Sequence, residues 1–171
     1  RHRSASLSGV CIDFAGSGTL SLAGSTITNN SAGLGGGINV SGSPGPAELR
    51  IKANTFITGN TAQDSGGGIR IAGNARLFML EDNRFVAFNK AITGEGGGVQ
   101  VLGPARADIG SPGAGGNLAV IYGNTAVNGG GVSVDAGQNP ARSADLRLFS
   151  TDATRLARIS NNAASNVGGG I

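Results

Sequence analysis

The sequence has little of what many folds and enzyme sites require. It contains one cysteine, one histidine and no tryptophan in 171 residues, and aromatic residues make up only 4%. Because Cys11 is alone, no internal disulfide can form. Because His2 is the only histidine, neither a histidine-ligated zinc site nor a Ser-His-Asp triad is expected. With so few aromatic residues, the core must be aliphatic.

Charge is also sparse. Only 13% of residues are charged, against a usual value of about 25%, and the net charge is +3. The arginines and lysines are scattered singly without a basic run, so we expect no nucleic-acid partner. No stretch of about 18 apolar residues occurs, so no transmembrane helix is expected. No metal-ligand spacing recurs, and we expect no cofactor.

Glycine and a repeat are what the sequence does contain. Glycine supplies 32 residues, about 19% against a usual value of about 7%. Five segments share one pattern: an aliphatic residue, two spacers, Asn, one spacer, Ala, a short gap, three glycines, then Ile or Val. These segments are residues 27–40, 57–71, 86–101, 121–134 and 159–171. A repeat of about 30 residues with later insertions is typical of a solenoid.

The repeated residues have structural reasons to recur. Asparagine tolerates left-handed backbone conformations, bonds its own backbone in turns, and can form hydrogen-bonded ladders when stacked. Glycine permits sharp corners and close backbone approach. We therefore expect these residues to build the fold rather than to carry chemistry. The asparagines are Asn30, Asn60, Asn89, Asn124 and Asn162, and the glycines are Gly35, Gly36, Gly37, Gly66, Gly67, Gly68, Gly96, Gly97, Gly98, Gly129, Gly130, Gly131, Gly168, Gly169 and Gly170.

Within each unit the hydrophobic period is two, which indicates strands. One alternating run follows the glycines, as in residues 38–40 and 69–71, and a second comes later, as in residues 49–52 and 78–81. The aliphatic-x-x-Asn-x-Ala segment is the third. Three short strands per unit predict an all-β fold, a right-handed parallel β-helix of about five coils of ~30 residues, with the alanines pointing inward. We expect residues 1–171 to form one such fragment, cut from a longer protein at both ends.

The paired motifs look like the repeat of polymorphic outer membrane proteins, in which Phe-x-x-Asn and Gly-Gly-Ala-Ile/Leu/Val alternate along a right-handed parallel β-helix. Here glycine replaces the alanine, and Ile or Val mostly replaces the phenylalanine, as in Ile57 to Asn60 and Gly66 to Ile69. The resemblance covers about residues 20 to 171. It implies an outer-membrane or secreted bacterial protein, an autotransporter-like parent and adhesion to a host protein or glycan.

The alternative is a fragment of a β-helix enzyme that acts on polysaccharides, either a lyase or a glycosidase. Such enzymes need clustered carboxylates. The candidate catalytic residues are Asp108, Asp135 and Asp145, which we expect in insertions that protrude from one side. Solvated loop charges are the competing interpretation. A cut solenoid also exposes unpaired strand edges, so we expect the isolated fragment to associate end to end.

Overall fold

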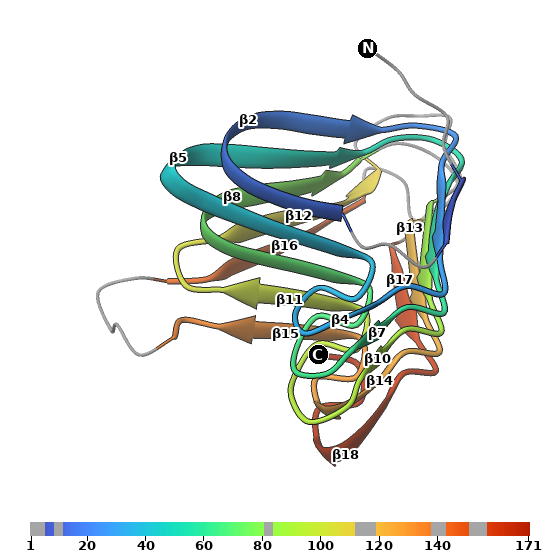
Figure 1. Ribbon diagram of the computed structural model, residues 1–171. Helices are drawn as coiled ribbons and strands as arrows, with labels where there is room; N and C mark the ends of the chain where they lie inside the picture. Colours follow the sequence, from blue (N-terminus) through green and yellow to red (C-terminus); the bar gives the residue numbers. More distant parts are fainter. Residues whose placement is uncertain (1–5, 9–11, 81–83, 112–118, 138–142, 151–156) are drawn as a thin grey trace.

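The computed structural model describes residues 6–8, 12–80, 84–111, 119–137, 143–150 and 157–171. These residues form strands in three parallel sheets that wind around one axis as a β-helix (Figure 1). Among them, no helix is long and apolar enough to cross a membrane. The stack makes about four turns, rather than the five coils expected from the repeat. The difference arises because five corner asparagines, from Asn30 to Asn162, enclose only four complete windings.

Sheet A is the wall that carries the aliphatic residue of each repeat. Its strands have the order β1 (Ser6–Ser8), β3 (Thr26–Thr28), β6 (Thr55–Thr58), β9 (Arg84–Ala87), β13 (Ala119–Tyr122) and β17 (Arg158–Ser160). The aliphatic side chains stack in register, with Ile27 paired to Ile57 and Ile57 to Val86. All three are fully buried, so this wall turns its aliphatic column toward the core.

Sheet C is a narrow wall just beyond the asparagines. It contains β4 (Ser31–Ala32), β7 (Thr61–Ala62), β10 (Lys90–Ala91), β14 (Thr125–Asn128) and β18 (Ala163–Val167). We expected the aliphatic-x-x-Asn-x-Ala segment to be one strand. The structure divides it between sheets A and C, because the chain turns sharply at the asparagine. The repeated alanine of the middle coils points inward, with Ala62, Ala91 and Ala126 buried.

Sheet B is the widest wall. It contains β2 (Ile12–Leu22), β5 (Ile38–Ile51), β8 (Ile69–Met79), β11 (Val99–Leu102), β12 (Arg106–Ser111), β15 (Val132–Asp135) and β16 (Asp145–Ser150). The two alternating runs expected as separate strands join here into one long bent strand in the early coils. In later coils the bend becomes a break, so that β8 pairs with both β11 and β12. Each coil therefore still has three walls, but they are divided differently along the chain.

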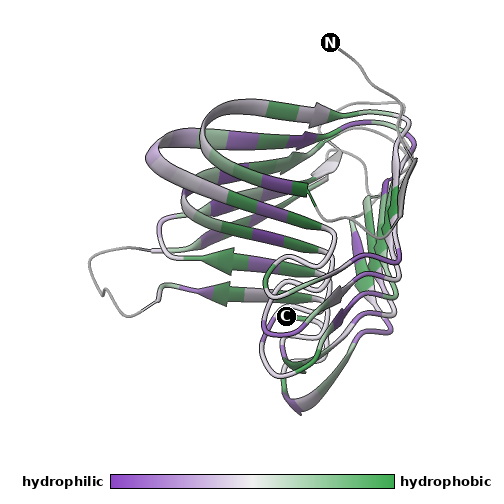
Figure 2. Ribbon diagram, in the orientation of Figure 1, coloured by the Kyte–Doolittle hydropathy of each residue, from purple (hydrophilic) through white to green (hydrophobic). Residues whose placement is uncertain are grey.

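The core is aliphatic, as the composition predicts. Buried residues such as Leu49, Ile71 and Leu77 come from every second position of the strands, and no aromatic residue belongs to the buried cluster of the described residues. Figure 2 shows hydrophobic and hydrophilic residues alternating along the strands of sheet B. This period of two places one set of side chains inside and the other on the outer face.

The five asparagines occupy one corner in a single column. The Oδ1 atom of Asn60 accepts hydrogen bonds from the backbone N and the Nδ2 of Asn30, at 3.0 and 2.8 Å. The Nδ2 of Asn60 in turn donates to Asn89 Oδ1 and to the carbonyl oxygen of Ile27. The same pattern continues through Asn89, Asn124 and Asn162. Each buried amide is thus satisfied by its neighbours in the stack.

The left-handed residue at this corner is not the ladder asparagine. It is the residue before it, whose φ is positive in every coil: Asn29, Gly59, Phe88, Gly123 and Asn161. The expectation that the ladder asparagines would supply the left-handed conformation is therefore wrong. Their role in the structure is hydrogen bonding, and the turn is made one position earlier.

The glycine triplets make the next corner, between sheets C and B, and their members have different tasks. The first has a positive φ, +70° at Gly66, which glycine adopts without strain. The second and third instead allow close packing between coils. A Cβ on Gly67 would fall on the carbonyl oxygen of Gly97, and one on Gly68 would lie 2.9 Å from Asn89 Nδ2.

Candidate functional site

All three predicted carboxylates lie on strands of sheet B. Asp108 is in the middle of β12, and Asp145 is the first residue of β16. The segment that was expected to protrude pairs along its length with β8 and β16, which corrects that expectation. Asp135 ends β15, well away along the same sheet. Arg142, between Asp135 and Asp145, lies outside the described residues.

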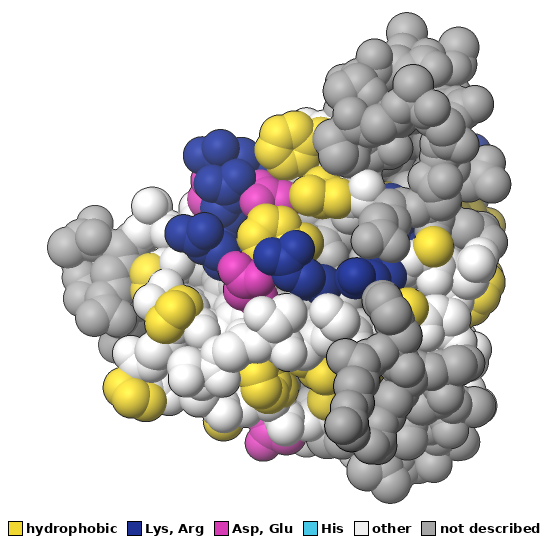
Figure 3. All heavy atoms as spheres, turned by 90° about the horizontal axis from the view of Figure 1, so that it is seen from above, with side chains coloured by type: hydrophobic (Ala, Val, Ile, Leu, Met, Phe, Trp, Pro, Cys, Tyr) yellow, Lys and Arg dark blue, Asp and Glu magenta, His cyan; other side chains and the backbone are white. Residues whose placement is uncertain are grey.

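Asp108 and Asp145 belong to a set of outward side chains on the later half of the sheet B strands, which we call the charged face. In one row Glu48 pairs in register with Arg76, Arg76 with Arg106, and Arg106 with Asp145. The next row runs through Arg50, Phe78, Asp108 and Arg147. Lys52 and Leu80 follow these rows along the chain. Figure 3 shows basic side chains gathered on this side around a few acidic and hydrophobic ones.

Every carboxylate of the charged face holds an arginine two residues away on its own strand. Arg50 binds Glu48 at 2.8 Å, Arg106 binds Asp108 at 2.7 Å, and Arg147 binds Asp145 at 2.9 Å. Residues two apart lie on the same side of a strand, which explains the pairing. Asp108 is only 4% exposed, so one of its oxygens is buried against Arg106.

Two cations of the face have no such partner. Neither Lys52 nor Arg76 makes an ion pair with another residue of the described chain. Beside them Arg50, Ile51, Lys52, Phe78 and Leu80 line a shallow hollow of about 100 Å³. The guanidinium of Arg50 lies 5.0 Å from the centre of the Phe78 ring. The hollow therefore combines an apolar floor with positive charge at its rim.

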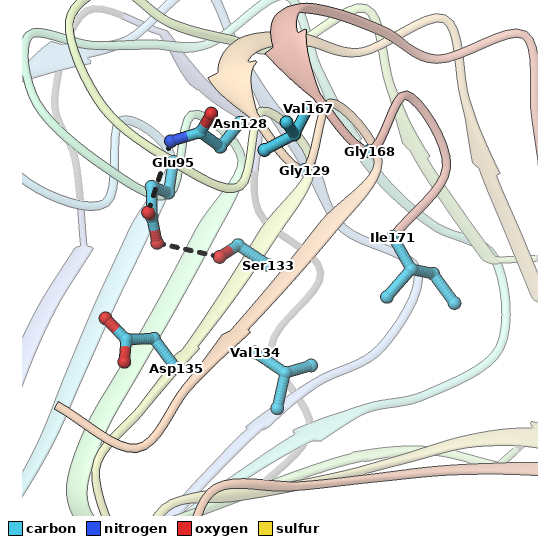
Figure 4. A pocket seen from close by; sticks show the side chains of 9 residues that line it. All are labelled: Glu95, Asn128, Gly129, Ser133, Val134, Asp135, Val167, Gly168 and Ile171. Carbon is cyan, nitrogen blue, oxygen red and sulfur yellow. Dashed lines mark hydrogen bonds between the residues drawn. The ribbon is translucent and has the colours of Figure 1, made fainter.

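Asp135 lines a different hollow, of about 490 Å³, near the glycine corner (Figure 4). A second carboxylate there, Glu95, accepts a hydrogen bond from Ser133 Oγ at 2.9 Å and one from Asn128 Nδ2 at 3.4 Å. The carboxylate of Asp135 accepts from the backbone N of Gly137. Figure 4 draws no hydrogen bond between the two carboxylates. The structure does not bring Asp135 together with Asp108 or Asp145 in one hollow.

At the start of the sheet B strands, the outer side carries a polar row that leads to Ser133 in this hollow. Arg70 donates to Asn39 Oδ1 at 3.2 Å, and Asn39 donates to Asp13. Burial lowers the pKa of Arg70, and the negative charge of Asp64 opposes that shift. The described part of the chain contains no group of three or more His, Cys, Asp or Glu side chains placed to hold a metal ion.

Asp135 was predicted from the sequence, but the other charged and aromatic residues that line the two hollows were missed. Arg50, Lys52 and Phe78 were visible only as polar or aromatic positions of the alternating runs. That alternation already places Arg50 and Lys52 on the same outer side. Glu95 had a weaker signal, since it directly precedes the triplet that begins at Gly96.

No known protein family, curated protein or solved structure matches the chain.

Proposed function

We propose that the chain is a segment of a non-catalytic β-helix rod, secreted or held at a bacterial cell surface, which presents its outer side chains for adhesion to a host protein or glycan. The resemblance of its repeat to the passenger repeats of polymorphic outer membrane proteins supports this location and an autotransporter-like parent. A rigid stack suits the role because every coil repeats the same corner bonds, so that outer residues keep fixed positions.

The observation that carries the proposal is the state of the carboxylates on the charged face. Glu48, Asp108 and Asp145 are each held by an arginine. A general acid or base must instead present its carboxyl group to the substrate. The remaining cations, exposed Arg76 and half-buried Lys52, lie beside the Phe78 hollow and are suited to binding rather than to bond cleavage.

The alternative is a polysaccharide-acting enzyme, and one observation favours it. Glu95 and Asp135 line the same hollow of about 490 Å³, and glycosidases use two carboxyl groups that flank the scissile bond. Both carboxylates already accept hydrogen bonds from the protein, Glu95 from two side chains.

A single experiment separates these functions. The purified chain is incubated with immobilised matrix proteins and with acidic and neutral polysaccharides, and both retention and new reducing or unsaturated ends are measured. We expect retention without cleavage, and no change in product formation for Asp108→Ala, Asp135→Ala and Glu95→Gln. Cleavage that disappears in Asp135→Ala and Glu95→Gln would overturn the proposal in favour of the enzyme.

We also propose that the isolated chain associates end to end. Val134, Leu148, Phe149, Val167 and Ile171 of the last described coil are all exposed. The strands β15 to β18 end their sheets and pair on one side only among the described strands. Light scattering should therefore show species larger than a monomer that shrink in Val134→Lys, whereas a single monomeric species for the unmodified chain contradicts the proposal.

A further inference from the structure

The positive charge of the charged face that no carboxylate balances is concentrated at one end, at β5 and β8, the first two strands of the face along the sequence. Five cationic side chains, Arg50, Lys52, Arg76, Arg106 and Arg147, stand against three carboxylates on the face. The three ion pairs within strands use up Arg50, Arg106 and Arg147. Lys52 and Arg76 remain, and both lie beside Phe78. An anionic ligand is therefore favoured at this end, because it would supply the negative charge that the described residues of the face do not.

The same end offers an apolar floor. Phe78 and Leu80 are half-buried with one side open, and the hollow between them and Lys52 measures about 100 Å³. The guanidinium of Arg50 lies 5.0 Å from the centre of the Phe78 ring, which adds a cation–π contact to this end of the face. A pyranose ring has a face of C–H groups that packs against an aromatic ring, whereas its substituents point to the sides. A sugar that carries an acidic group satisfies both features at once.

The spacing of the face favours a polysaccharide over a peptide. Strands of neighbouring coils lie about 4.8 Å apart, which is close to the length of one pyranose residue in a chain. An extended peptide lying along the stack would repeat its side chains on one face only every ~6.6 Å. A peptide also cannot add as a strand here, since β5 and β8 are paired on both sides.

We propose that the charged face binds a linear polysaccharide of uronic acids that lies along the stack. Its carboxylates contact Lys52 and Arg76, and one sugar packs on Phe78. This inference rests on the proposed non-catalytic binding role and specifies its ligand. The following sugars of the polysaccharide would contact Arg106 and Arg147, which already form ion pairs with Asp108 and Asp145.

The test measures binding of the folded chain to alginate oligomers, a polymer of uronic acids, by calorimetry. The variant Lys52→Gln/Arg76→Gln should weaken binding by about tenfold or more, because two charge-assisted contacts are lost. The matched control is Lys90→Gln/Arg158→Gln, which also removes one lysine and one arginine, both exposed, from sheets C and A. It should leave the affinity within about twofold, since exposed distant charges are screened.

A second variant tests the apolar floor. Phe78→Ala should weaken alginate binding about fivefold, while Phe85→Ala, on the outer side of sheet A, should not. Circular dichroism and thermal melting show whether each variant is folded, and only folded variants are compared. Equal binding by the Lys52→Gln/Arg76→Gln variant and its control overturns the inference.

Other polymers distinguish the remaining outcomes. Dextran sulfate or single-stranded DNA binding more tightly than alginate overturns the assignment to uronic acids, as does equal binding of a neutral glucan. A folded chain that binds none of these polymers but retains a matrix protein also overturns it, yet leaves the proposed binding role intact. Alginate that is bound and shortened overturns the non-catalytic role, whereas the assignment of the ligand then stands on the Lys52 and Arg76 variants.

Discussion

The asparagine corner and the charged face are columns made by the same stacking, but they differ in what occupies them. At the corner every level holds the same residue, and each amide bonds the next at 2.8 to 3.0 Å. On the face the equivalent levels hold Glu48, Arg76, Arg106 and Asp145. Repetition is found where the backbone depends on the side chain, and variation where the side chain meets solvent.

The two columns differ physically in burial. Asn30, Asn60, Asn89 and Asn124 are at most 1% exposed, so an unmatched polar group there would lose its hydrogen bonds without gaining water. Arg50, Arg76 and Arg147 are exposed and can be solvated whatever their neighbours are. This difference predicts that substitutions at the corners destabilise the fold and that substitutions on the face change binding instead.

The largest effect is expected at the glycine corner. In Gly67→Ala the new Cβ would fall on the carbonyl oxygen of Gly97 and within 2.5 Å of the carbonyl carbon of Lys90. Both are backbone atoms of the next coil, so the stack must separate locally. We expect a loss of at least about 4 kcal/mol in the free energy of unfolding, or failure to fold, in urea denaturation monitored by circular dichroism.

Gly33→Ala is the control for that substitution. Its Cβ would meet nothing within 4 Å, and its φ lies outside the left-handed region. The free energy of unfolding of this variant should differ from that of the unmodified chain by less than about 0.5 kcal/mol. Equal stability of the Gly67→Ala and Gly33→Ala variants would show that the coils are not packed as closely at this corner as the structure has them.

A smaller loss is expected within the asparagine column. Asn60→Ala removes the acceptor of two hydrogen bonds from Asn30 and the donor to Ile27 and Asn89. Buried polar groups of Asn30, Ile27 and Asn89 each lose a hydrogen-bond partner, which should cost about 3 kcal/mol of unfolding free energy. The exposed Asn74 provides the comparison, since Asn74→Ala should change the free energy of unfolding by less than about 0.5 kcal/mol.

The fold could be predicted from the sequence because its determinants recur. An aliphatic residue, an asparagine, an alanine and three glycines at nearly fixed offsets imply that equivalent backbone positions are superimposed. A period of two then assigns the inner and outer sides. What could not be predicted is where the strands bend, because β5 and β8 pair with an irregularity between Gly42 and Ala47 that no repeated residue marks.

The same irregularity explains why the charged face was missed. Glu48 and Arg76 are neighbours in register, yet Glu48 lies 18 residues after Asn30 and Arg76 only 16 after Asn60. Without the register, counting from the repeat does not bring these residues together. The expectation that Asp108 protrudes was wrong for the same reason, since its segment continues the sheet at a shifted offset.

Phe88 shows a further limit of prediction from the repeat. The other coils place Asn or Gly at its left-handed position, whereas Phe88 adopts a φ of 56° and is 63% exposed. Such a conformation costs a non-glycine residue about 1–2 kcal/mol. The ring lies against Tyr122 in an edge-to-face contact with centroids 5.4 Å apart, which offsets part of that cost. The repeat identifies the left-handed position, but it does not predict that an aromatic residue can occupy it when a ring contact offsets the conformational cost.

The smallest effects are expected on the charged face, where a buried ion pair should contribute more to stability than an exposed one. Asp108→Asn removes a charge-assisted acceptor whose side chain is 6% exposed and paired with Arg106, so unfolding free energy should fall by about 1–2 kcal/mol. Asp145→Asn removes a carboxylate that is 41% exposed, and solvent screening limits its loss to about 0.5 kcal/mol. Urea denaturation at low and high salt measures both, and salt should reduce only the already small effect at Asp145. If both variants lost the same amount, burial would not distinguish the two ion pairs, and the whole face would have to be regarded as solvated surface.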